Sequence, residues 1–232
     1  MTTTSTTANP ARIFATPGPI RAVVTIPAGS LEFTASDRTD TTVEILPADP
    51  AGSRDLKAAE RVTVEYGDGV LRIQGPARNR ILGSSGAVRI VVHLPAGSQV
   101  EAEAAAAEVR STGRLGNVAF AGAASWIKLD EVASARLTTE AGDVSIGRLD
   151  GAAEIRTGKG DIRIDRARRG TVVLHAAYGA ISIGAAPGVP ASLDADTSYG
   201  RVHCSLANAD GHAVDLDIHA STGYGDITAR SL

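Results

Sequence analysis

Two aspartates are the residues of this sequence best placed to do chemistry. Asp143 and Asp161 each follow a glycine, at equivalent places in a repeat described below. If successive copies of the repeat stack, the two carboxylates lie about 4.8 Å apart, a spacing that suits a Ca²⁺ site or the acid chemistry of polysaccharide-cleaving β-helices. The row is interrupted by Ala180 and Arg201 before it returns at Asp226, and an aspartate after glycine commonly bonds its own backbone in a turn. We therefore favour a structural role for these aspartates over the calcium candidate.

Three tyrosines recur at one place in the same repeat. Tyr178, Tyr199 and Tyr224 each immediately precede a glycine, and they are three of the four tyrosines in the chain. The equivalent positions in earlier copies hold Ala141 and Lys159. If the copies are in register, three rings line one edge, and stacking there is worth about 0.5–1.5 kcal/mol per pair beyond burial. We favour this shielding role; the alternative is a flat aromatic strip that binds a sugar chain or a partner's side chains, so these three tyrosines are the candidate binding residues.

Other residue types that catalyse reactions or bind metals show no recognisable spacing. No HxH, HExxH or CxxC motif occurs, which argues against a zinc site. The single cysteine, Cys204, takes an inward apolar position and is expected in the core, so its neighbour His203, on the opposite face, is not placed to activate it. A glycine-rich run at residues 158–161 lacks the helix and the Lys-Ser/Thr end of a phosphate loop. We expect no catalytic residue, no resident metal, no cofactor and no enzymatic activity. Of the five histidines, one lies in a loop, His212, and alternation places the other four on an outer face: His93, His175, His203 and His219.

A repeat in the second half of the chain positions all of these residues. A glycine precedes an alternating strand at positions 142, 160, 179, 200 and 225, with spacings of 18, 19, 21 and 25 residues, and a degenerate earlier copy begins at Gly116. An 18-residue unit extended at about 3.3 Å per residue gives a path of roughly 60 Å, enough for one coil of a β-solenoid with two or three sides. The glycine suits a corner, where a positive φ costs an L-residue about 1 kcal/mol or more. The residues expected to point inward are Val144, Ile146, Ile162, Ile164, Ile181, Ile183, Val202 and Cys204.

An all-β fold follows from this pattern. The competing architecture is a series of hairpins in a sandwich, but inward residues that stay small and aliphatic from copy to copy favour a solenoid of stacked, parallel β-helix-like coils. In the first half, alternation predicts strands, and Gly67-Asp68-Gly69 predicts a hairpin. The expected strands of this half span residues 20–26, 31–35, 42–46, 62–66, 70–73 and 88–94, with at best a short helix at 55–60. We expect a disordered N-terminus at 1–11, an N-terminal capping region of strands and hairpins at 12–104 and the solenoid at 105–232.

Composition narrows the classes of partner. The formal net charge is −3 and is mixed along the chain, which gives no electrostatic footprint for nucleic acid. The N-terminus lacks a basic and then apolar leader, and no run of about 18 apolar residues exists to span a bilayer. These observations predict a cytoplasmic protein without membrane insertion.

Three runs carry a resemblance to a known family. Residues 139–144, 157–162 and 222–227 resemble the bacterial β-strand-repeat family filed as "putative adhesin" and "domain of unknown function", and residues 35–41 and 94–98 resemble segments that precede the repeats in actinobacterial members. The resemblance covers about residues 13–230 and implies an all-β, solenoidal fold. It supplies no catalytic residue.

The function expected from the sequence is that of a non-enzymatic binding or self-assembly module. Solenoid ends are strand edges that pair with other chains unless they are capped, and only residues 228–232 follow the last Gly-Asp pair. We therefore expect self-association through the C-terminal coil, with an unidentified protein or glycan ligand. The alternatives are a carbohydrate-active enzyme that uses the corner aspartates and an exported cell-surface adhesin.

Overall fold

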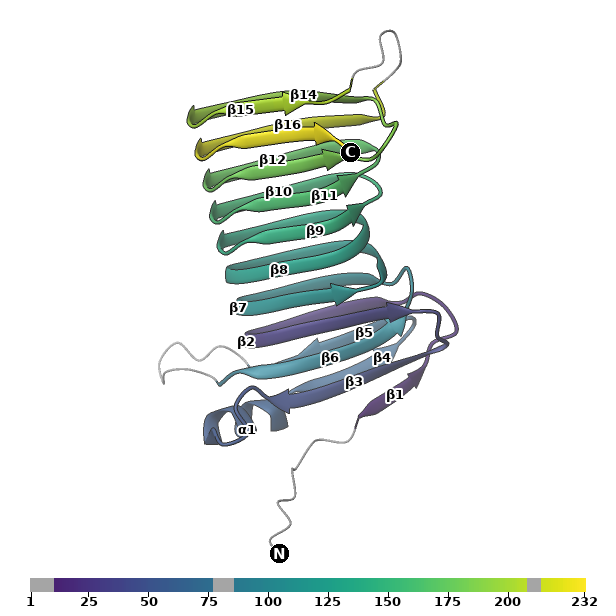
Figure 1. Cartoon of the computed structure of the whole chain (residues 1–232). Helices are drawn as coiled ribbons and strands as arrows, with labels where there is room; N and C mark the ends of the chain where they lie inside the picture. The colour runs from purple at the N-terminus through teal and green to yellow at the C-terminus, as the bar shows by residue number, and fades with distance from the viewer. Residues whose placement is uncertain (1–10, 77–85, 208–213) are drawn as a thin grey trace, which may run out of the picture.

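The computed structural model describes residues 11–76, 86–207 and 214–232, and it confirms the all-β solenoid. Figure 1 shows the strands stacked as a column, with the N-terminal region at its base. Two ladders of parallel strands form the column. We call the ladder that precedes the glycine corner face A and the ladder that follows it face B. In the repeat, face A holds β10 (Ala153–Lys159), β12 (Gly170–Tyr178), β14 (Ala191–Tyr199) and β16 (Leu216–Tyr224), and face B holds β9 (Val144–Leu149), β11 (Ile162–Ala167), β13 (Ile181–Ala185), β15 (Val202–Ser205) and β17 (Ile227–Ser231).

Aliphatic residues stack inside the column from coil to coil. Ile162 aligns with Val144 on one side and with Ile181 on the other, and all three are buried. Burying such a side chain contributes about 1.5–3 kcal/mol, and a slip of one residue would turn the whole set outward. The expected inward residues of β9, β11 and β13 are therefore confirmed.

The last two coils stack in the reverse of their sequence order. β16 pairs with β12 on one side and with β14 on the other, and β17 likewise lies between β13 and β15. Figure 1 shows β16 between β12 and β14. The expectation that the C-terminal coil ends the stack is wrong. After β13 the chain leaves one level empty and forms the end coil from β14 and β15. It then comes back to fill the empty level with β16 and β17. The longer spacings of 21 and 25 residues around Gly200 supply the chain for this path.

The first strand of the column is also out of sequence order. The long β2 (Arg21–Ser36) lies between β7 (Gln99–Thr112) and the pair β5 (Val70–Gln74) and β6 (Val88–Pro95), parallel to all three. The segments 20–26 and 31–35, expected as two strands, form this one strand, which bends around the corner. From β7 the chain continues into β8 (Arg114–Ala141), which supplies strands to both faces. The boundary expected between residues 104 and 105 falls inside β7.

Antiparallel strands close the base. β3 (Asp40–Pro47) runs antiparallel to β6, β1 (Arg12–Ala15) to β3, and β4 (Thr63–Gly67) to β5, while the helix α1 (Ser53–Glu60) lies between β3 and β4 in sequence. The hairpin of β4 and β5 turns at Asp68 and Gly69, which have φ of 51° and 74°. The expected hairpin is thus present, and the column begins on strands that run in the opposite direction to its coils.

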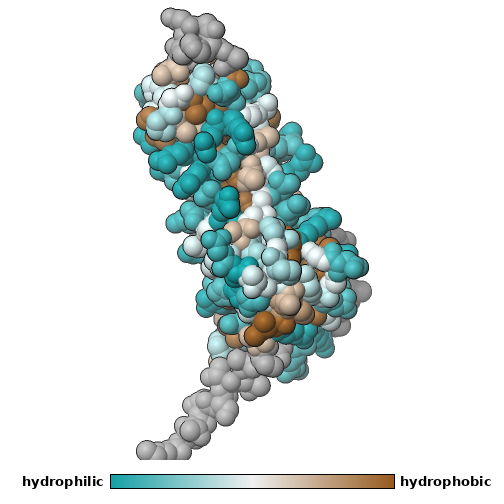
Figure 2. Space-filling view, turned by 90° about the vertical axis from the view of Figure 1, so that its right-hand side faces the viewer, coloured by the Kyte–Doolittle hydropathy of each residue, from teal (hydrophilic) through white to brown (hydrophobic). Residues whose placement is uncertain are grey.

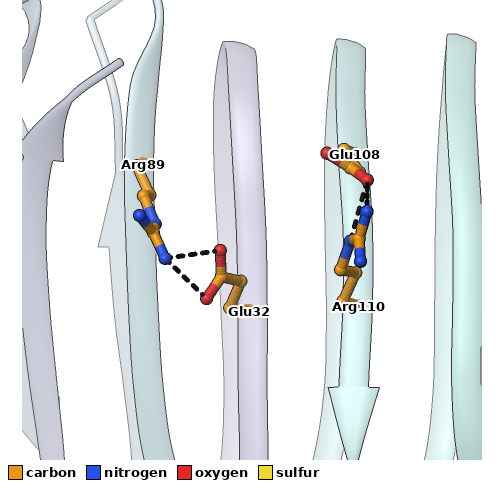
Figure 3. Close-up of polar contacts among 4 residues, drawn as sticks. All are labelled: Glu32, Arg89, Glu108 and Arg110. Carbon is orange, nitrogen blue, oxygen red and sulfur yellow. Dashed lines mark hydrogen bonds and ion pairs between the residues drawn. The ribbon is translucent and has the colours of Figure 1, made fainter. Parts of the chain in front are cut away.

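Ion pairs lie on the outer surface of face B near the base. Arg89 of β6 pairs with Glu32 of β2 at 3.0 Å, and Arg110 pairs with Glu108 within β7 (Figure 3). Exposed pairs of this kind contribute about 0–1 kcal/mol each. These pairs mark the solvent-facing side of the strands, and their contribution to the stability of the fold is small.

Candidate functional site

The glycine corner is built by close approach between coils. A Cβ added to Gly160 would lie 2.3 Å from the carbonyl oxygen of Gly142, and one added to Gly179 would lie 2.0 Å from that of Gly160. The φ angles of Gly160 and Gly179 are 144° and 153°, as expected for a corner. Gly200 has no positive φ in the left-handed range, yet its added Cβ would meet the Gly225 oxygen at 1.9 Å. Space for the neighbouring carbonyl, more than φ, therefore favours glycine at the corner positions from Gly142 to the end coil.

The corner aspartates accept hydrogen bonds from the backbone of the adjoining coil. Asp143 Oδ1 accepts the N–H of Asp161 at 2.8 Å, and Asp161 Oδ1 accepts the N–H of Ala180 at 2.7 Å. Asp226 Oδ1 accepts the N–H of Arg201 at 2.9 Å, because its coil lies directly beneath that of Arg201. Within the described residues, no group of three or more His, Cys, Asp or Glu side chains is arranged to hold a metal ion. The geometry thus gives these carboxylates a structural use at each step of the column.

The three tyrosines form a ladder, in the spatial order Tyr178, Tyr224 and Tyr199. The ring centroids of Tyr178 and Tyr224 lie 5.0 Å apart and those of Tyr199 and Tyr224 lie 4.7 Å apart, with 4° between the planes in each pair. Because each ring covers the face of the next, the ladder presents ring edges and the phenol end of each ring outward. The rings therefore stack on one another, as in the interpretation favoured from the sequence, and do not form the flat strip of exposed ring faces that was its alternative. Tyr199, at 66% exposed, has a neighbouring ring on only one of its faces.

Trp126 extends the same corner toward the base. Its Cδ1 would lie 3.1 Å from a Cβ added to Gly142, and its side chain is 65% exposed. Two levels separate Trp126 from Tyr178, and they hold Ala141 and Lys159; Lys159 aligns with Tyr178 on one side and with Ala141 on the other. All eight aromatic residues of the chain lie in the described part, and the four that are exposed, Trp126 and the three tyrosines, all occupy this corner. We call the set Trp126, Lys159, Tyr178, Tyr224 and Tyr199 the aromatic corner.

Sequence reasoning missed Trp126 because the repeat was traced by its glycines. In the coil below Gly142 the corner position is Ser125, whose carbonyl oxygen a Cβ on Gly142 would meet at 1.9 Å. Gly116, taken as the earlier copy, lies instead beside the turn at Gly97, at the other end of the face A strand. Trp126 lies 16 positions before Gly142 and directly follows the corner residue, whereas the tyrosines directly precede it, so a search on both sides of the corner would have found the tryptophan.

Hollows accompany the corner and face A. One, of about 470 Å³, lies beside Trp126 and is lined mainly by small residues, among them Ala106, Ala107 and Ala141. A second, of about 550 Å³, crosses the beginnings of the face A strands, where polar side chains such as Asn117 and Ser134 line it. The opposite side of the column, where the connections between coils lie, is mostly hydrophilic in its middle and more hydrophobic toward the ends (Figure 2). Exposed aromatic surface is thus confined to the glycine corner.

A polar cluster joins the last two coils on face A. Asp217 Oδ1 accepts a hydrogen bond from Ser192 at 2.6 Å, and His219 Nε2 lies 3.0 Å from Asp217 Oδ2, while its Nδ1 lies 3.5 Å from Asp194 Oδ2. The hydrogen bonds from Ser192 and His219 hold the pKa of Asp217 below its usual value. Contact with Asp217, and more weakly with Asp194, raises the pKa of His219. The outward positions expected for His175 and His219 agree with their hydrogen bonds on this face, and His212 lies outside the described residues.

Cys204 is exposed, so its expected place in the core is wrong. It does align with the buried Ala229 and takes an inward position. Its other side is open because β15 belongs to the end coil. The neighbouring His203 is also exposed and turns to the outer surface.

Stacked parallel ladders with a recurring glycine corner define a β-strand-repeat solenoid. The family model described as Toastrack DUF4097 matches residues 23–231, and the chain therefore belongs to this family of unknown function. The actinobacterial type suggested by its N-terminal segments remains a prediction.

Solved structures match the chain at low sequence identity, and the first of them, with a TM-score above 0.5, shares its fold. A putative adhesin from Bacteroides fragilis is 10% identical, with 94% of this chain and 95% of that chain covered and a TM-score of 0.53. A putative adhesin from Parabacteroides distasonis is also 10% identical, with 94% and 96% covered and a TM-score of 0.45. No curated protein matches the chain. No helix among the described residues is long and apolar enough to cross a membrane.

Proposed function

We propose that the chain is a non-enzymatic, adhesin-like binding module that contacts a protein partner through the aromatic corner. The observation that carries this proposal is the gathering of all four exposed aromatic side chains on one edge of the column. Tyrosine and tryptophan are enriched at the energetically dominant positions of protein interfaces, where a large ring combines with a polar tip. These exposed aromatic side chains need an explanation, since Lys159 and Ala141, at the position of the tyrosines in two other coils, show that this position accepts other residues.

The ring arrangement favours a protein ligand over a sugar chain. Sugars stack on open aromatic faces, whereas Tyr224 has both faces covered by its neighbours. Ring edges and hydroxyl groups, spaced at 4.7–5.0 Å by the coils, suit polar and apolar side chains of an extended partner. The hollow beside Trp126 adds a place for one apolar side chain.

A peptide-display selection tests the proposal. Peptides selected on the wild-type chain should bind the variant Tyr178→Ala/Tyr199→Ala/Tyr224→Ala at least about tenfold more weakly. The triple Tyr→Phe variant separates the hydroxyl groups from the rings, and Ile13→Ala, which removes an exposed apolar side chain at the base, is the matched control. Equal binding by the triple Ala variant would refute the proposal, as would a wild-type chain that retains only members of a glycan panel.

The proposal requires neither of the two locations considered for the chain. Cytoplasmic placement and surface export both remain predictions. Catalysis through the corner aspartates is not part of the proposed function, since their carboxylates serve the backbone of the neighbouring coil.

A further inference from the structure

No described strand pairs with the outer edges of the coil at the end of the column away from the base, and we call this end the open end. Among the described residues, β14 pairs only with β16, and β15 pairs only with β17. The inward positions of this coil are accordingly uncovered: Val202 is 44% exposed, whereas its partner Ile227 on the next coil is fully buried. Leu193 is only half-buried, against a fully buried Ile218. The end coil therefore presents two unpaired strand edges around an apolar centre.

The base does not offer a matching surface. Its outermost strands, β1 and β4, run antiparallel to their neighbours and span four and five residues. A parallel coil added there would meet strands of the wrong direction and register. Head-to-tail growth into a filament is thus disfavoured, and a contact of the open end with itself, which is closed and two-fold, is favoured.

Charge selects one of the two ways in which open ends can meet. A two-fold axis perpendicular to the faces would pair β14 with the partner's β14, and the exposed Asp194 and Asp196 would then lie beside the same aspartates. A two-fold axis parallel to the strands pairs β14 with the partner's β15, which carries the outward His203 and is immediately preceded by the exposed Arg201. Strands run antiparallel in both cases, but only the second arrangement sets acidic beside basic side chains.

The aromatic corner selects the same arrangement. An axis parallel to the strands keeps the glycine corners of both copies on one side of the column. Tyr199 is the last ring of its ladder, with its outer face uncovered by any other ring. In this arrangement Tyr199, at the end of β14, lies beside the start of the partner's β15, whereas an axis perpendicular to the faces places each corner against the other copy's connecting loops.

We propose that two copies of this chain join end to end through β14 and β15, about a two-fold axis parallel to the strands, into one continuous column with the glycine corners of both copies on one side. The occupant of the open end is a second copy. The dimer goes beyond the proposed binding role and does not require it, so either can fail alone.

Light scattering after gel filtration, across a concentration series, tests the association. The wild-type chain should pass from monomer to dimer and no further. Val202→Lys places a charge at the open end, as natural edge strands do to block pairing, and should raise the dissociation constant at least about tenfold. Ile13→Lys, at a similarly exposed apolar residue of the base, should leave it unchanged. A strict monomer, or larger species that grow with concentration, would overturn the proposal.

Charge reversal tests the arrangement. Asp196→Arg and Arg201→Asp should each weaken the dimer, and the double variant should recover most of the loss. If Asp196→Arg strengthens association, the ends meet β14 to β14 and the inferred axis is wrong.

The single cysteine reports the interface directly. Cys204 lies in the end coil, and dimerisation should slow its reaction with a thiol reagent as protein concentration rises. Reaction at a constant rate while light scattering reports a dimer would show that copies associate elsewhere. Protection by a selected peptide in a monomeric sample would instead assign the open end to a different protein.

Discussion

At the scale of single residues, the corner glycines hold the coils at their spacing. Four corner glycines have φ between 124° and 153°, and Gly200 does not, yet all five leave room for a carbonyl oxygen of the adjoining coil; the four are Gly142, Gly160, Gly179 and Gly225. Threonines complete the corner from inside: Thr222 Oγ1 donates to the Gly179 oxygen at 2.9 Å, and Thr197 Oγ1 donates to the Gly225 oxygen at 3.0 Å. The corner carbonyls are thereby satisfied where water is largely excluded.

Replacing one corner glycine should destabilise the column. Gly179→Ala places a methyl group 2.0 Å from the Gly160 oxygen at a φ of 153°, and we expect it to lower the free energy of unfolding by about 2–4 kcal/mol. Urea denaturation followed by circular dichroism measures the loss. Gly67→Ala is the control, since its Cβ would have no atom within 4 Å and its φ is not positive. Equal midpoints for the two variants would contradict the steric account.

At the scale of elements, the polar cluster on face A fastens β14 to β16. Ser192 and Asp194 belong to β14, while Asp217 and His219 belong to β16. The end coil buries little of its apolar side, so these contacts supply part of its attachment. Their charges give the attachment a pH dependence.

We expect the cluster to stabilise the protein most between the ordinary pKa of aspartate, 3.8, and that of histidine, 6.5. The raised pKa of His219 gives a contribution that is complete below 6.5 and is lost as pH rises through the folded-state value. The lowered pKa of Asp217 gives a contribution that is present above 3.8 and is lost as pH falls through the folded-state value. Thermal midpoints of wild type and His219→Gln, measured against pH, should therefore differ most inside this window.

His93→Gln, on β6 near the base, is the control for that measurement. A difference between wild type and His219→Gln that does not change with pH would show that the histidine acts through packing rather than through its charge.

At the scale of the whole molecule, both ends of the column are formed by strands out of sequence order. At the base, β2 lies closer to the middle of the column than β5 and β6, which follow it in sequence. At the other end, the C-terminal β16 and β17 lie closer to the middle than β14 and β15, which precede them. The end coil is therefore tethered to inner coils at both of its own ends. The C-terminal segment has neighbours on both sides and cannot fray as the last repeat of a serial solenoid would.

Hydrogen exchange should reveal this order. In dilute protein, backbone amides of Leu216–Tyr224 and Ile227–Ser231 should exchange more slowly than those of Ala191–Tyr199 and Val202–Ser205, because only the former are paired on both sides. Mass spectrometry of peptic fragments measures the difference. Faster exchange in the C-terminal segment would mean that the coils stack in sequence order after all.

Much of the fold and part of the candidate site follow from local pattern. Alternation identified the strands, and glycine spacing placed the corners, because the two-residue period of a strand and the space at a corner are read from neighbouring residues. Tyr178, Tyr199 and Tyr224 could be placed on one edge for the same reason. Trp126 could not, since its coil has Ser125 at the corner and breaks the pattern used to find the others.

By itself the sequence determined that this chain forms coils, which side chains point inward and which residues share a corner. Only the tertiary structure decided the order in which the coils stack, and with it the exposure of Cys204, the central place of Tyr224 and the identity of the open end. The physical reason is that repeats with similar inward residues offer similar edges, so that any coil fits beside several others. The choice then depends on connection lengths and on contacts between distant segments, such as Asp226 with Arg201, which no local pattern contains.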